Sequence, residues 1–153
     1  MTPTEVSPIA PGFRSITPFL MVDGVPAFLD FLRKVFDVQV TRQYAGPNDT
    51  ITHAEVRLDD SVIMIGDPMG KYPLAPAALY FYVTNVDSVY KQALDAGATS
   101  VREPNKEFYG DRVAAVKDHW GNTWWLATHV EDVGEEELQR RNAEQHAVLV
   151  NTG

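Results

Sequence analysis

Three polar side chains suited to chemistry lie two residues apart in the segment "THAEVRL": His53, Glu55 and Arg57. If this segment is a strand, alternate residues point to the same side, and the three side chains share one face. An imidazole beside a carboxylate is suited to general acid–base catalysis, so His53 and Glu55 are the candidate catalytic residues. With His129 as a third ligand they could instead hold a catalytic zinc ion, and a solvated polar face is the remaining interpretation.

Several other kinds of site are excluded or disfavoured by composition. The sequence contains no cysteine, which excludes disulfides, thiolate nucleophiles and cysteine metal ligands. We find no nucleophile elbow, no phosphate-binding glycine loop and no nucleic-acid-binding motif. A formal net charge of −8 disfavours nucleic acid and anionic membrane surfaces as partners, and it mildly favours small cations.

The chain has 153 residues, of which 44% are hydrophobic, and this predicts one globular domain with a substantial core. No apolar run approaches the length of a membrane span, so no membrane association is expected. The first residues, "MTPTEVSPIAPGF", lack the basic and then apolar pattern of a signal peptide. We therefore expect a cytoplasmic protein.

Hydrophobic periodicity predicts one series of elements that occurs twice, strand-helix-strand-strand-strand. The first copy has its helix in "DGVPAFLDFLRKVFD", and the second has its helix in "VDSVYKQALDAGA", which ends at Gly97. The first strands of the two copies lie 63 residues apart, counted from Ile16 to Leu79. Such a duplication in the order of elements often defines a whole fold.

A two-residue turn at Asp59-Asp60 is expected to join two strands of the first copy, and it fixes which residues face each other. The expected pairs are Glu55 with Met64, Arg57 with Val62, and His53 with Gly66. Beyond the two copies, we expect an N-terminal arm at 1–14 and a charged helical tail at 131–153. The domain itself is expected at 15–130, with modules at about 15–68 and 76–130. The tail is interpreted as a packing or dimer arm.

The segments "ITPFLMVDG", "HAEVRLDDSVIMIGDP" and "FYGDRVAAVKDHWGNTWW" resemble the vicinal oxygen chelate superfamily, which contains glyoxalases, bleomycin-resistance proteins and extradiol dioxygenases. The closest resemblance is to its PhnB-like branch. The most specific element is the D-x-x-G-N turn of Asp118, Gly121 and Asn122, in which His119 replaces the usual proline. The resemblance implies an α+β fold, with two βαβββ modules that form a curled mixed sheet around a shared cavity. It also implies pairing of modules, commonly in a homodimer.

In this superfamily a metal ion is usually held by side chains on the first and last strands of each module. The corresponding positions here are Thr17 and Met64 in the first module, and a residue at or near Ala78 together with Trp125 in the second. A hydroxyl, a thioether, a methyl group and an indole do not form a site for a hard or borderline divalent ion. We therefore predict no metal ligands and no cofactor, with a divalent metal as the alternative.

These positions also indicate which face of each strand lines the cavity, because residues two apart share a face. Trp124 is then expected in the core, and Trp125 in the cavity wall. Arg112 is added because it resembles a recurrent position in the PhnB-like branch, and an internal salt bridge with Asp111 or Asp118 is its alternative role. The predicted ligand-binding residues are Thr17, Phe19, Arg57, Met64, Tyr80, Tyr82, Arg112 and Trp125.

Aromatic walls with a few polar groups are typical of a small-molecule site. The sequence thus favours a metal-free binding protein of the bleomycin-resistance type that holds an aromatic or cationic ligand. The alternatives are a glyoxalase-like metal-dependent lyase or dioxygenase, and a metal-independent acid–base enzyme that uses His53 and Glu55.

Overall fold

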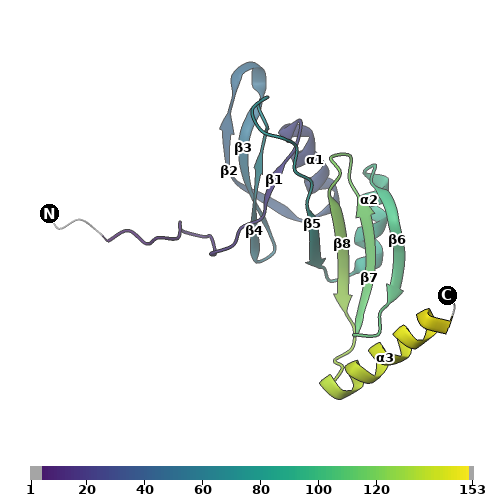
Figure 1. Ribbon diagram of the computed structural model, residues 1–153. Coiled ribbons are helices and arrows are strands. Elements are labelled where there is room, and N and C mark those ends of the chain that lie inside the picture. The colour runs from purple at the N-terminus through teal and green to yellow at the C-terminus, as the bar shows by residue number, and fades with distance from the viewer. Residues whose placement is uncertain (1–4, 152–153) are drawn as a thin grey trace. The chain divides into compact units, whose positions relative to one another are not determined.

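The computed structural model describes residues 5–151, and for 148–151 it describes the backbone alone. Residues 1–4 of the expected arm and 152–153 of the expected tail therefore lie outside the described residues. The chain divides into two compact units, Met1–Pro76 and Ala77–Gly153. Each unit contains one copy of the repeated series of elements, as the labels in Figure 1 show.

The first unit contains four strands in the order β1-β4-β3-β2. Strand β1 pairs with β4 in parallel, and the other pairs are antiparallel, so the sheet is mixed. Strand β1 is shorter than expected, because it begins at Phe19 and leaves Thr17 in the segment that precedes it. The elements are β1 (Phe19–Met21), α1 (Val25–Val35), β2 (Val38–Ala45), a short 3-10 turn (Pro47–Asp49), β3 (Ile51–Leu58) and β4 (Ser61–Gly66).

Helix α1 begins after Gly24, whose φ of 84° lies in the left-handed region that glycine adopts without strain. Pro26 stands in the first turn, where its missing N–H costs no helical hydrogen bond. The helix packs on β3, and its apolar side chains recur at helical spacing and are buried. They are Val25, Phe28, Leu29, Phe31, Leu32 and Val35.

The expected hairpin of the first unit is confirmed in its register. Glu55 lies opposite Met64, Arg57 opposite Val62, and His53 opposite Gly66. Ala54, Val56 and Leu58 are buried on the other side of β3, toward the helix. Strand β3 therefore has a buried apolar face and a face that carries the polar side chains.

The second unit repeats this topology, with the strand order β5-β8-β7-β6 and one parallel pair, β5 with β8. Helix α2 packs against β6, β7 and β8 and begins after Asn85, whose side chain accepts a hydrogen bond from Ser88 N. The elements are β5 (Ala78–Tyr82), α2 (Val86–Asp95), β6 (Thr99–Lys106), β7 (Asp111–Lys117), β8 (Thr123–His129) and α3 (Glu135–Asn151). The predicted α+β fold with two βαβββ modules is confirmed.

The D-x-x-G-N turn joins β7 to β8 through hydrogen bonds to a buried carboxylate. Asp118 accepts the backbone N–H groups of Trp120 and Asn122, each at 2.9 Å, and the indole N–H of Trp124 at 2.9 Å. Asn122 in turn accepts a hydrogen bond from the N–H of Ala77, the residue before β5. Trp124 is 1% exposed and belongs to the core, as expected. The residues that carry the family resemblance at this turn are therefore structural.

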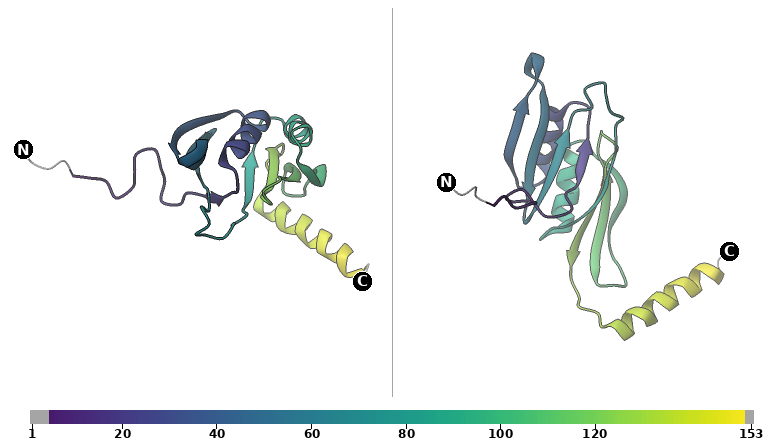
Figure 2. Two further views of the ribbon diagram at one scale, coloured as in Figure 1. Left: turned by 90° about the horizontal axis from the view of Figure 1, so that it is seen from above. Right: turned by 60° about the vertical axis from the view of Figure 1, so that its left-hand side comes forward.

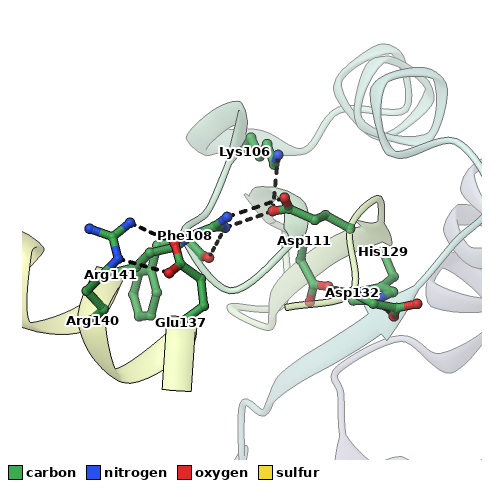
Figure 3. Close-up of polar contacts among 9 residues, drawn as sticks. Lys106, Phe108, Asp111, His129, Asp132, Glu137, Arg140 and Arg141 are labelled. Atoms are coloured by element: carbon green, nitrogen blue, oxygen red, sulfur yellow. Dashed lines mark hydrogen bonds and ion pairs between the residues drawn. The ribbon is translucent and has the colours of Figure 1, made fainter. Parts of the chain in front are cut away.

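Helix α3 lies beyond the end of the second sheet (Figures 1 and 2). Arg141 attaches it, donating hydrogen bonds to the carbonyl of Phe108 at 3.0 Å and to Glu131 at 2.8 Å (Figure 3). Arg141 and then Lys106 lower the pKa of Glu131 to about 2, so this carboxylate stays charged. No helix within the described residues is long and apolar enough to cross a membrane.

Candidate functional site

The face of the first sheet that does not pack on α1 carries the candidate catalytic residues. His53 Nε2 lies 3.4 Å from Glu55 Oε1, so the predicted pair is brought together. The His53 ring stacks on Tyr44 with a centroid distance of 5.6 Å, and Phe19 approaches it edge-on at 6.2 Å. Glu55 is 8% exposed. The result is an imidazole fixed between two rings beside a largely buried carboxylate.

Glu55 has a second polar neighbour. Arg42 Nε lies 3.9 Å from Glu55 Oε2, across the β2–β3 pair. The carboxylate of Glu55 thus faces an imidazole on one side and a guanidinium on the other. The same open face also holds Met64 and Arg57. Met64 is paired with Phe19 on one side and with Glu55 on the other. The predicted residues Phe19, Arg57 and Met64 thus share one face with the candidate catalytic pair.

A tighter polar cluster lies on the open face of the second sheet, around Asp111 at the start of β7. Asp111 is 2% exposed and accepts hydrogen bonds from three side chains. Tyr80 donates its hydroxyl at 2.7 Å and Tyr82 donates its hydroxyl at 2.8 Å, both to Oδ2. His129 Nδ1 lies 2.7 Å from Oδ1, and His129 Nε2 lies 2.7 Å from Asp132 (Figure 3). We call Tyr80, Tyr82, Asp111 and His129 the Asp111 cluster.

Strand order explains how the cluster forms. Both tyrosines stand on β5, and they reach Asp111 on β7 across β8, which lies between those strands. The β8 residue opposite both Tyr82 and Val113 is Ala127, whose small side chain leaves room for this crossing. His129 reaches Asp111 directly, because the two residues are paired across β7 and β8. The sheet itself therefore fixes the positions of all four side chains.

The protonation states follow from these contacts. Burial alone would raise the pKa of Asp111, but the hydrogen bonds from His129, Tyr80 and Tyr82 outweigh it and hold that pKa below its usual value. The contact with Asp111, and then that with Asp132, raises the pKa of His129. Burial and the bond to Asp111 raise the pKa of Tyr80, and the bond to Asp111 and burial raise that of Tyr82. At neutral pH both hydroxyls keep their protons and donate them to a charged Asp111.

The aromatic surface beside this cluster is partly open. Tyr80 is 46% exposed and Tyr82 is 56% exposed, and their ring centroids lie 5.3 Å apart in an edge-on arrangement. Trp125 on β8 is paired with Tyr80 and is half-buried on the same face. The three predicted residues Tyr80, Tyr82 and Trp125 are therefore brought together. They form an aromatic surface next to a buried negative charge.

Two predicted ligand residues lie elsewhere. Arg112 points from β7 toward α2, where its guanidinium binds both carboxylate oxygens of Asp87 at 2.8 Å. Neighbouring residues of a strand face opposite sides, so Arg112 lies on the reverse face from Asp111, and we correct its placement in the ligand site. Its ion-pair partner is Asp87, and not Asp111 or Asp118, the two partners in its alternative role. Thr17 precedes β1 and lies beside a hollow at the N-terminal arm.

The residues at the usual metal-ligand positions do not fit a divalent ion. Met64 is paired with Phe19, and Trp125 with Tyr80, so an aromatic side chain also faces each last-strand position. Thioether, indole and phenyl groups are not ligands for hard divalent cations. Within residues 5–151, no group of three or more histidine or acidic side chains is arranged to hold a metal ion.

Comparison with known proteins identifies the superfamily to which this chain belongs. The sequence pattern of the Glyoxalase/Bleomycin resistance protein/Dioxygenase superfamily matches residues 13–126. The chain belongs to this superfamily. An uncharacterized protein of Mycobacterium bovis is 30% identical over 142 residues, which cover 86% of this chain and 93% of the relative.

Solved structures of low sequence identity share the superfamily fold. TioX from Micromonospora sp. ML1 aligns with a TM-score of 0.62 at 18% identity, over 79% of this chain and 100% of TioX. The PhnB protein of Bacillus cereus aligns with a TM-score of 0.63 at 19% identity, over 75% of this chain and 99% of that protein. A PhnB-like protein is thus one structural neighbour among several, and these likenesses concern the fold.

Asp111 is the site residue that sequence reasoning missed. It was considered only as a partner for Arg112, its neighbour in the chain. The signal was present in the hairpin, because a register that pairs Lys117 with Thr123 also pairs Asp111 with His129. Counting outward from the Asp118 turn would have placed a carboxylate and an imidazole side by side on the tyrosine face.

Proposed function

We propose that this protein is a metal-independent small-molecule-binding protein of the bleomycin-resistance type. Its ligand is an aromatic cation, held on the open face of the second sheet by Tyr80, Tyr82 and Trp125. The observation that carries this proposal is that both tyrosine hydroxyls donate their protons to Asp111. A ligand that approaches these hydroxyls therefore meets oxygen lone pairs, which accept hydrogen bonds from the ligand.

Charge and ring geometry support the same ligand class. Two carboxyl groups, those of Asp111 and Asp132, face the single imidazole of His129, so acidic groups outnumber basic groups in this cluster. The exposed rings present electron-rich faces, which attract a cation and stack on a planar ligand. An overall charge of −8 raises the local concentration of cations around the chain.

Isothermal titration calorimetry with a charge-reversed pair of probes tests the proposal. Benzamidine is a planar aromatic cation, and benzoate is an anion of nearly the same shape. Benzamidine should bind, and Trp125→Ala should weaken its binding about 5- to 30-fold, as expected for a lost contact of about 1–2 kcal/mol. Tyr72→Ala, which removes an exposed ring from the first unit, is the matched control and should bind like the wild type.

Three results would refute the proposal. They are failure of the wild type to bind benzamidine, equal affinity of Trp125→Ala and the wild type, and stronger binding of benzoate than of benzamidine on the second unit. Stoichiometric metal binding with a large thermal stabilisation by nickel, zinc, manganese or iron(II) would instead favour the lyase or dioxygenase alternative.

Acid–base catalysis stays the second candidate, because His53 and Glu55 lie together on the first sheet. Acid–base catalysis needs residues of the first unit, whereas cation binding needs residues of the second. Substitutions in one unit therefore test one function without removing the residues of the other. The homodimer and the cytoplasmic location expected from the sequence stay predictions.

A further inference from the structure

The arginines of the chain differ in whether they form an ion pair, and this difference indicates a second site. Of the eight arginines in the sequence, six form an ion pair. They are Arg33, Arg42, Arg102, Arg112, Arg140 and Arg141. Arg14 and Arg57 are the two for which residues 5–151 offer no carboxylate within ion-pair distance, and both line one hollow of about 500 Å³ in the first unit.

The N-terminal arm forms one wall of this hollow. Pro11 and Gly12 occupy the centre of a turn that Phe13 N closes by donating to Ala10 O at 3.1 Å. Gly12 has a φ of 85°, which suits the third position of a type II turn and follows a proline in the second position. This turn places Phe13 and the following arginine beside the β3–β4 hairpin.

The hairpin forms the opposite wall. Arg57 and Val62 are paired across β3 and β4, and both line the hollow. They also line an adjoining hollow of about 210 Å³, together with Arg42 and Glu55. Arg57 thus stands where the two spaces meet, and its half-buried side chain is reachable from either.

Local charge here is opposite in sign to the charge of the chain. The charged residues that line the two hollows are Arg14, Arg42, Arg57, Glu55 and Asp60, which leave one net positive charge. The whole chain carries −8. Solvation of a long side chain can account for one unpaired arginine. It does not explain why both unpaired arginines of an acidic protein line the same hollow.

We propose that this hollow binds a small organic carboxylate, with its anionic group at Arg14 and Arg57. A guanidinium matches the planar geometry of a carboxylate and binds it through two parallel hydrogen bonds. Phe13, Ile16 and Val62 line the same space and offer apolar contacts to the body of the ligand. This site lies within the first unit and does not depend on cation binding by the second.

The test is a titration of the full chain with benzoate, followed by calorimetry and by NMR of the arginine side-chain N–H groups. Benzoate should bind and should shift the signals of Arg14 and Arg57. Arg57→Gln should weaken benzoate binding at least about tenfold, the effect of losing a charge-assisted contact. Arg33→Gln, which removes an arginine from an exposed pair on α1, is the matched control and should leave binding unchanged.

Inorganic phosphate and benzamidine complete the test. Phosphate should bind more weakly than benzoate, because it has no apolar body, and benzamidine should not perturb Arg14 or Arg57. Absence of benzoate binding, equal affinity of Arg57→Gln and the wild type, or tighter binding of phosphate at these arginines would each overturn the proposal. Arg57 has no ion pair to lose, so Arg57→Gln should unfold close to the wild-type temperature, and a thermal melt of the variant separates loss of the fold from loss of the site.

Discussion

Asp111→Asn tests the central claim about the candidate site, because it removes the charge of Asp111 and keeps its shape. In the wild type the carboxylate accepts the hydroxyl protons of Tyr80 and Tyr82. A hydrogen bond to a charged group contributes about 1 kcal/mol more than a neutral one. The two tyrosine bonds then account for a loss of about 2 kcal/mol in the free energy of unfolding before solvent screening. Since both rings are about half exposed, the expected tyrosine part of the loss is about 1 kcal/mol, and the weakened contact with His129 adds to it.

The same substitution reverses the polarity of the site. An asparagine that turns its NH₂ group toward Tyr80 and Tyr82 donates to their oxygens, which frees the hydroxyl protons to point outward. The site then offers donors where the wild type offers acceptors, and it has lost one negative charge. Benzamidine binding should fall at least about tenfold, the effect of a lost charge-assisted contact.

Urea denaturation at pH 7 measures the stability, and calorimetry with benzamidine measures the binding. The double variant Tyr80→Phe/Tyr82→Phe supplies the control background, because it lacks both hydroxyls. In that background Asp111→Asn should cost clearly less stability than it does in the wild type. An equal cost in both backgrounds would show that the hydroxyls do not contribute, and the reasoning would be wrong.

Two further predictions concern stability. Asp111 and then Asp132 raise the pKa of His129 from 6.5, so its stabilising effect is fully present below about pH 6.5 and is lost as the pH rises through the higher pKa of the folded state. The stability difference between His129→Gln and the wild type should therefore shrink between pH 6 and pH 9 in urea titrations, and a constant difference would contradict this assignment. Asp118→Ala should lower the free energy of unfolding by about 3–5 kcal/mol, because it removes four hydrogen bonds from a buried turn at once. Asp87→Ala, which breaks an exposed pair with Arg112, should change it far less.

The fold was predictable because its signals are local and periodic. Apolar residues at helical spacing define α1, and strict alternation with a two-residue turn at Asp59-Asp60 fixes the register of β3 and β4. Once that register is known, the shared face of His53, Glu55 and Arg57 follows from strand geometry alone. The separation of Trp124 from Trp125 was predictable for the same reason, because neighbouring residues of a strand face opposite sides.

The Asp111 cluster was harder to predict, because its members come from three strands. The hydrogen bonds from the tyrosines on β5 to Asp111 on β7 also pass across β8. That Tyr80 and Tyr82 reach Asp111 depends on strand order, on the small Ala127 between them, and on side-chain length. Arg112 illustrates the opposite error. A resemblance at one position suggested a ligand contact, whereas strand alternation directs the side chain toward Asp87 on α2.

The two units share a topology, and both carry the buried carboxylate of the open face on the same equivalent strand. In the superfamily pattern a metal-binding carboxylate stands on the last strand of each module, whereas here Met64 and Trp125 occupy those positions. The buried carboxylates of the open faces stand one strand inward, Glu55 on β3 and Asp111 on β7. Asp111 already accepts hydrogen bonds from two hydroxyls and contacts an imidazole, so in the proposed function it acts on the ligand through the tyrosine oxygens that it polarises. If the proposed function is correct, a carboxylate one strand inward and covered by tyrosines serves an organic cation through those hydroxyls, where the superfamily pattern uses a carboxylate to coordinate a metal ion directly.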